Sequence, residues 1–212
     1  MPGWNIHLEA GRRLSKRIKL PKEVEEEFLF GCLLPDINNG YVNKKVKEVK
    51  EHHETHWAFN DKSSLNFYAS YKKQVDERDP IYLGYLLHLY TDGYFNYNFY
   101  RTVKRRGKFK KLTREEKQDL KHNDFWKYDA EFSDCEFVVR DKENVVKKAN
   151  KIQGVKLDEE EVEEIEEIMN SDKFEQAARE RDYIFYTKEK LDVLMEEMLD
   201  SFVSDYVREE NA

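Results

Sequence analysis

The sequence predicts an all-helical protein with one central buried helix. Only four prolines and eight glycines interrupt its 212 residues, and apolar residues recur three or four positions apart over long stretches. Residues 81–100 are apolar on nearly every side, which is typical of a helix buried at the centre of a bundle. We therefore expect one all-helical domain over residues 1–212, with a core in 1–100 and a helical extension, 101–212, packed on it.

Apolar spacing and helix-start signals divide the first half into five helices. The expected elements are, in order, a helix over 8–20, a helix from Pro21 to Leu34, a loop over 36–40, a basic helix over 42–57, a helix begun by Asn60 or Asp61 with an apolar stripe through Leu65, Tyr68, Tyr71 and Val75, and the apolar helix begun by Asp79 and Pro80.

The second half is more highly charged, and its helices are predicted from capping signals and apolar stripes. The expected elements are, in order, an exposed basic connection over Arg101–Lys111, a helix opened by a capping box of Thr113 and Glu116, a packed aromatic stretch over Phe125–Val139, an acidic helix over Asp158–Met169, and a last helix with an apolar face from Leu191 to Phe202.

Composition restricts the function. A net charge of -7 argues against general nucleic-acid binding. Two cysteines, Cys32 and Cys135, are too few for a disulfide framework and are expected to be reduced. No basic start followed by an apolar stretch marks a signal peptide, and no apolar run approaches bilayer length. We expect a cytoplasmic protein with no integral membrane segment; the sequence leaves the oligomeric state open.

A histidine and an aspartate on the apolar helix are the strongest functional signal. His88 and Asp92 are four residues apart, so both side chains project from one helix face and can hold one metal ion. Gly84, one turn earlier on that face, leaves room for a neighbouring backbone or a ligand. An ionised Asp92 in this apolar setting needs a counter-charge, which a cation supplies. A hydrogen-bonded His–Asp pair in the core is the alternative for these two residues alone.

Three further positions favour a metal site. Asp36 follows an apolar helix end, where the helix dipole makes a carboxylate unfavourable unless a cation is bound; an Asx-type turn is the alternative. His7 precedes the first apolar stripe, and a capping or core histidine is its alternative. His56, flanked by Trp57, is expected to point inward, whereas His52 suits a solvated helix end and His53 stays a possible additional ligand. Nitrogen and oxygen donors together suit zinc, and also manganese or iron(II).

At these residues the chain resembles the zinc-dependent phospholipase C family, and most of all a short, uncharacterised bacterial branch. The resemblance covers roughly the first 100 residues. The matching pieces are His7 in Trp4-Asn5-Ile6-His7, Phe30-Gly31-Cys32-Leu33-Leu34-Pro35-Asp36, Thr55-His56-Trp57, and Leu83-Gly84-Tyr85-Leu86-Leu87-His88-Leu89-Tyr90-Thr91-Asp92. The last piece is the most specific. The family's fold is all-helical, with metals at the centre.

The resemblance also implies a ligand set. One site would use Asp36, His56, His88 and Asp92, and a second would share Asp92 and add His7, so residues 1–100 would form a metal-binding core. The family's third site, which holds part of the phosphate, lacks its residues after Asp92 here, and Trp4 is not N-terminal as the family's ligating tryptophan is. One or two ions are therefore expected, and His122 or Asp124 is a possible additional group.

The resulting functional expectation is a zinc-dependent phosphoric-ester hydrolase, a phosphodiesterase or phosphomonoesterase that uses metal-activated water on a small phosphorylated substrate. By the resemblance, Asp36 would be the catalytic carboxylate that orients the water or takes its proton. The basic run Arg101–Lys111 would attract such a substrate or simply be solvated. The alternative is a non-catalytic metal-binding helical protein or interaction module with a degenerate site. A phosphohydrolase of the HD type ranks last, because no adjacent His-Asp occurs.

Overall fold

The computed structural model describes residues 2–38, 46–58, 62–133, 136–171 and 176–207, and every regular element in these ranges is helical. The all-helical prediction is therefore confirmed for the described part of the chain. The elements are, in order, α1 (Trp4–Arg17), α2 (Lys22–Gly31), α3 (Leu34–Ile37), α4 (His52–Thr55), α5 (Ser63–Asp76), α6 (Pro80–Arg105), α7 (Gly107–Lys110), α8 (Arg114–Asp129), the 3-10 turn η1 (Ala130–Phe132), α9 (Lys142–Ala149), α10 (Glu159–Met169), α11 (Gln176–Arg179) and α12 (Lys188–Tyr206).

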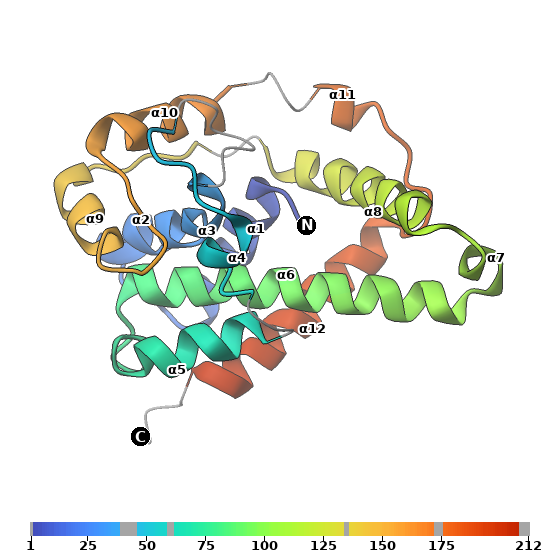
Figure 1. Ribbon diagram of the computed structural model, residues 1–212, viewed down its shortest axis with the longest axis horizontal. Helices are drawn as coiled ribbons and strands as arrows, with labels where there is room; N and C mark the ends of the chain where they lie inside the picture. Colours follow the sequence, from blue (N-terminus) through green and yellow to red (C-terminus); the bar gives the residue numbers. More distant parts are fainter. Residues whose placement is uncertain (1, 39–45, 59–61, 134–135, 172–175, 208–212) are drawn as a thin grey trace.

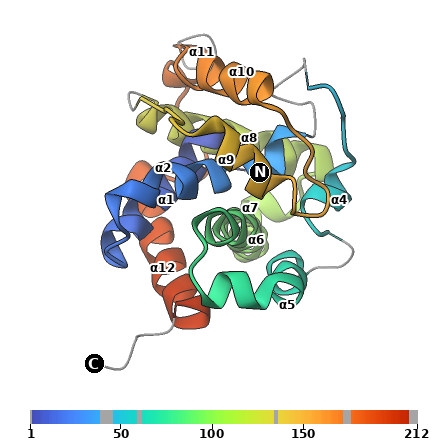
Figure 2. The ribbon, with the colours of Figure 1, turned by 90° about the vertical axis from the view of Figure 1, so that its left-hand side faces the viewer.

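Helix α6 is the axis around which the others are arranged. It runs along the length of the molecule, with α5 and α12 on one side and α1, α2 and α8 on the other (Figure 1). Viewed end-on it lies inside the ring of helices (Figure 2). The Asp79 side chain caps the first turn of α6 by accepting a hydrogen bond from Ile81 N. Pro80 occupies the first helical position, where its restricted backbone angle suits a helix. Every residue from Ile81 to Leu89 is buried.

Two glycines bring the backbones of α2 and α6 into direct contact. A Cβ at Gly84 would lie 2.2 Å from the carbonyl oxygen of Phe28, and one at Gly31 would lie 2.5 Å from that of Ile81. Real side chains do not approach so closely, so both positions require glycine. The space expected beside Gly84 is therefore filled by another backbone, and this contact brings the end of α2 against His88.

The expected basic helix over 42–57 is wrong where the structure describes it. Only the short α4 is helical, and residues 46–51 are not. Lys47 N donates to Glu161 Oε1 and Lys50 N donates to the carbonyl oxygen of Asn38, so the backbone bonds to distant segments instead of to itself. Asn60 and Asp61, proposed as caps of the next helix, lie outside the described residues; α5 begins at Ser63, and Leu65 of its expected stripe is largely exposed.

Three further boundaries differ from the sequence-based expectations. α1 begins at Trp4, so His7 lies within it, because the Asp129 carboxylate accepts from Ile6 N at 2.9 Å and caps the early start. Pro35 occupies the first turn of α3 instead of ending a helix, so Asp36 is helical. The expected basic connection Arg101–Lys111 is mostly helical, because α6 continues to Arg105 and α7 follows.

Capping boxes open two helices of the second half, and the first of them is predicted from the sequence. The box of Thr113 and Glu116 opens α8, and Asp158 with Glu161 opens α10 in the same way. The last helix, α12, buries its apolar face from Leu191 to Phe202 as expected. Buried apolar residues from both halves form one continuous cluster. No helix in the described ranges has the length and apolarity that crossing a bilayer requires.

Candidate metal centre

The structure brings together all five predicted ligands, from four separate elements. His7 comes from α1, Asp36 from α3, His56 from the residue after α4, and His88 and Asp92 from adjacent turns of α6. Each is less than 9% exposed. Buried polar side chains of this kind need partners, because losing water without replacement is costly. Donor atoms of His7, His88 and Asp92 lie within 4.8 Å of one another, as do those of Asp36, His56 and His88.

The imidazoles of His56 and His88 meet through their Nε2 atoms, which are 3.3 Å apart. Asp36 Oδ1 is also 3.3 Å from His56 Nε2. Two nitrogens that share a tetrahedral zinc ion at about 2.0–2.1 Å are themselves about 3.3–3.4 Å apart. Asp92 Oδ2 lies 3.6 Å from His56 Nε2 and 3.8 Å from His88 Nε2. The donor set and its spacing therefore fit a divalent transition-metal ion.

Hydrogen bonds at the far side of each ring leave the Nε2 atoms available for a metal. His88 Nδ1 donates to the carbonyl oxygen of Cys32 at 2.8 Å, so Nε2 carries the lone pair. His56 Nδ1 lies 2.9 Å from Thr55 Oγ1, and the Thr55 carbonyl in turn accepts from the Tyr85 hydroxyl. When both Nδ1 atoms carry the proton, two Nε2 lone pairs face each other, and a proton or a cation must lie between them.

His7 and Asp92 contain the unsatisfied atoms of the cluster. Both ring nitrogens of His7 and Oδ1 of Asp92 are buried without a hydrogen-bond partner. His7 Nε2 lies 3.6 Å from Asp92 Oδ1, which is too long for a hydrogen bond, and its ring stacks on His88 with centroids 3.7 Å apart. The two oxygens of Asp92 therefore face different histidines, as a carboxylate between two ions would.

Charges in the cluster are strongly shifted by burial and by one another. Burial, and then the charge of His7, lowers the pKa of His88 to about 3, so its ring is neutral at pH 7. Burial would raise the pKa of Asp36, but the imidazoles of His88 and His56 lower it to about 2. Burial would lower the pKa of His56, but its contact with Asp36 raises it. Without a metal, we take the extra proton to reside on His56, between the two carboxylates.

The remaining candidates lie outside this cluster. His53 is exposed, whereas His52 is half-buried and stacks on His56 with centroids 3.9 Å apart. His122 stacks on Trp126. Asp124 is fully buried but accepts hydrogen bonds from the backbone N–H groups of residues 184–186, so it anchors that segment to α8. Neither His122 nor Asp124 belongs to the two groups of candidate ligands. Cys32 is a buried free thiol, and Cys135 lies outside the described residues.

Several residues outside the predicted ligand set support the cluster. Thr55 and Tyr85 orient His56, and Asp129 fixes the start of the helix that carries His7. Burial raises the pKa of Asp129 to about 6. The contacts of Tyr85 with Thr55 and of Asp129 with Ile6 join residues 30 and 123 positions apart, which local patterns do not reveal.

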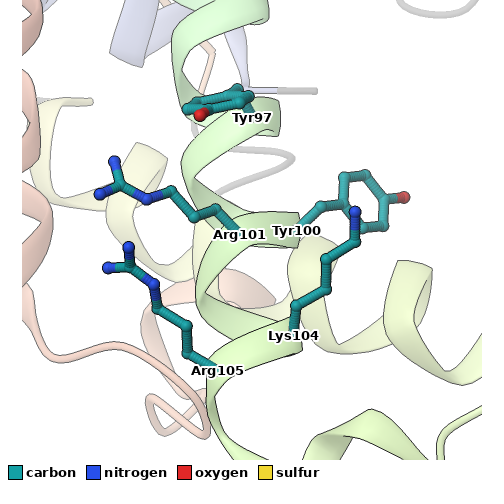
Figure 3. Close-up of a pocket in the computed structure, with 5 residues that line it drawn as sticks. All are labelled: Tyr97, Tyr100, Arg101, Lys104 and Arg105. Atoms are coloured by element: carbon teal, nitrogen blue, oxygen red, sulfur yellow. The ribbon is translucent and has the colours of Figure 1, made fainter.

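The basic run lies on the exposed far end of α6. A pocket of about 430 Å³ is lined there by Tyr97, Tyr100, Arg101, Lys104 and Arg105. Arg101 and Arg105 extend in the same direction from successive turns, with Tyr100 and Lys104 on the other side of the helix (Figure 3). Its attraction for a phosphorylated substrate stays a prediction.

Comparisons with known proteins add no further evidence. No family model, curated protein or solved structure matches this chain.

Proposed function

We propose that this chain is a metal-dependent hydrolase that cleaves a phosphoester with an activated water. The observation that carries the proposal is the gathering of three imidazoles and two carboxylates in one buried cluster, with the Nε2 atoms of His56 and His88 3.3 Å apart. The resemblance to the zinc-dependent phospholipase C family supports the same residues. Zinc suits the nitrogen and oxygen donors, and manganese and iron(II) are the alternatives.

Each residue of the cluster has a role in such a site. Asp36, His56, His88 and Asp92 would hold one ion, and His7 with the second oxygen of Asp92 would hold another. A bound divalent cation supplies a water with a pKa near 7 and neutralises charge on a phosphoryl oxygen. Asp36 stays ionised, because neighbouring imidazoles lower its pKa, and it would be the carboxylate that accepts a proton from this water.

Metal analysis tests the first step of this proposal. The wild-type protein, loaded with zinc or manganese and desalted, should retain metal, and His88→Ala and Asp92→Ala should lose it. His122→Ala is the matched control, because that histidine stacks on Trp126 outside the cluster. Equal, negligible metal in wild type and both cluster variants would refute the metal centre.

Hydrolysis of a phosphomonoester and phosphodiester panel tests the second step. Metal-dependent turnover by the loaded wild type, absent from His88→Ala, is the expected result. The second candidate function is a non-catalytic metal-stabilised protein. The burial of the cluster favours it, since the histidine side chains are at most 3% exposed and only the carboxylates, 8–10% exposed, reach solvent. Metal retention without turnover on any ester would support that candidate.

A further inference from the structure

A buried lysine contacts α6 one turn beyond the candidate ligand Asp92. Lys121, on α8, is only 6% exposed, and its ammonium donates to Asn96 Oδ1 at 2.9 Å. Asn96 follows Asp92 by four residues, and Tyr100 follows Asn96 by four, so the three form one row along α6. The Lys121 ammonium also lies 5.7 Å from the centroid of the Tyr100 ring. The cation is thus held along the row that begins at a candidate metal ligand.

Burial of an ammonium is unfavourable without an anionic partner. Burial lowers the pKa of Lys121, and the negative charge of Asp92 is the main described group that opposes this effect. In the described part of the chain, no carboxylate oxygen lies within ion-pair distance of Lys121; its described hydrogen bond is to the neutral amide of Asn96. The group therefore carries a positive charge that the described carboxylates do not pair directly.

We propose that Lys121 is the anion-binding residue of this centre and holds a phosphoryl oxygen of the substrate. The inference rests on the proposed function and extends it to substrate binding. An ammonium has three N–H donors, and one of them is directed at Asn96, which fixes the side chain. The remaining donors can bind an oxygen of a phosphoryl group that enters beside Asp92.

Charge balance favours the same ligand. Asp36 and Asp92 contribute two negative charges, and one divalent ion cancels them. Asp129, at the start of the helix that carries His7, adds a third negative charge, which Lys121 balances. The second ion of the proposed function then leaves the centre with an excess positive charge. An anion with several oxygens completes such a site, because each oxygen can meet a separate cation. A neutral ester would leave this excess charge uncompensated, so the substrate class is an anionic phosphate ester.

Binding of inorganic phosphate tests the proposal without requiring turnover. Wild type and Lys121→Met would be loaded with zinc and desalted, their metal content measured, and phosphate titrated by calorimetry. Met has a similar length and no charge, so the variant should fold and keep its metal. Phosphate affinity should fall roughly tenfold or more, as expected for loss of a charged hydrogen bond. Lys73→Met removes the same charge from α5, where the side chain is 80% exposed, and should leave affinity unchanged.

A second variant covers the case in which Lys121→Met fails to fold. Asn96→Asp keeps Lys121 but places a carboxylate against its ammonium, and phosphate affinity should again fall. Phosphate bound equally well by metal-loaded wild type and these variants would overturn the role of Lys121 and leave the metal centre standing. Metal-loaded wild type that binds no phosphate would do the same. Wild type that holds no metal would overturn the proposed function and this inference with it.

Discussion

The Nδ1 atom of His88 donates a hydrogen bond to the carbonyl oxygen of Cys32 at 2.8 Å. Cys32 is the residue that ends α2, where carbonyl groups lack partners within their own helix. One bond therefore satisfies a helix end, sets the tautomer of His88 and directs its Nε2 atom into the cluster. The packing of α2 on α6 is thereby linked to the availability of a metal ligand.

Substitution of Gly84 tests this link. In Gly84→Ala the new Cβ would lie 2.2 Å from Phe28 O and 2.9 Å from Cys32 N, so α2 must move away from α6. We expect the free energy of unfolding to fall by roughly 1–3 kcal/mol, as in overpacked cores. Metal affinity should fall as well, because the Cys32 carbonyl moves with its helix. Urea denaturation and zinc titration measure the two effects.

Gly93 provides the matched control on the same helix. A Cβ there meets nothing within 4 Å. Gly93→Ala should raise the free energy of unfolding by about 0.5–1 kcal/mol, since alanine favours helix, and leave metal affinity unchanged. If the two alanine variants behaved alike, the close contact between α2 and α6 would not be the controlling feature.

The sequence predicts much of the framework because its signals are local. The Asp79 cap and Pro80 mark the start of α6, and apolar spacing marks α10 and α12. The helix predicted over 42–57 does not form over residues 46–51, where Lys50 N donates to Asn38 O and Lys47 N donates to Glu161, 114 positions away in the chain. Local composition does not reveal hydrogen bonds to other segments of the chain.

The candidate site follows the same division. His88 and Asp92 were found from their spacing on one helix. The prediction that His7, Asp36 and His56 join them rests on their positions near helix ends and on the family resemblance. The structure brings all five into one cluster. The roles of Lys121 and Asp129 are not predicted from the sequence, because an isolated charged residue on an amphipathic helix is usually exposed at the surface. Their roles depend on how α8 lies against the other helices.

Tyr85 and Thr55 should tune metal affinity without contacting the metal. The Tyr85 hydroxyl donates to the Thr55 carbonyl, and Thr55 Oγ1 lies 2.9 Å from Nδ1 of His56. Thr55→Val removes the hydroxyl that fixes the His56 ring, and we expect roughly 10–100-fold weaker metal binding. Competition with a chromophoric chelator measures the affinity. Thr91→Val is a control, because that hydroxyl bonds to Leu87 O within the same helix. Equal affinities for Thr55→Val and wild type would contradict the orienting role.

Removal of metal should destabilise the protein. An ion that binds only the folded chain adds RT ln(1 + [L]/Kd) to its stability, which is about 4 kcal/mol at a thousandfold excess over Kd. The unpaired atoms of His7 and Asp92 lose their partner when the ion leaves. Addition of a chelator should therefore lower the melting temperature of wild type, measured by calorimetry, and should have no effect on His88→Ala. An identical melting temperature with and without chelator in wild type would contradict the prediction.

The stability of the metal-free protein should decrease in acid because of His88. Burial lowers the pKa of His88 in the folded chain to about 3, against 6.5 when unfolded. Between these values the unfolded chain binds more protons, so the contribution is complete above pH 6.5 and is lost as the pH falls towards 3. The slope can reach about 1.4 kcal/mol per pH unit. His56, whose pKa is raised, acts in the opposite sense, and its contribution is lost as the pH rises above 6.5.

A comparison with His88→Gln isolates this effect. Glutamine does not titrate and is close to histidine in size. Between pH 6.5 and 4.5, the free energy of unfolding from urea denaturation should fall more steeply for wild type than for the variant. Acid loss from Asp36 occurs lower, below about pH 3.8, because its folded pKa is about 2. Parallel curves for the two proteins between pH 6.5 and 4.5 would show that His88 is not held neutral by its surroundings, and with that the physical basis for its availability as a ligand at neutral pH would fail.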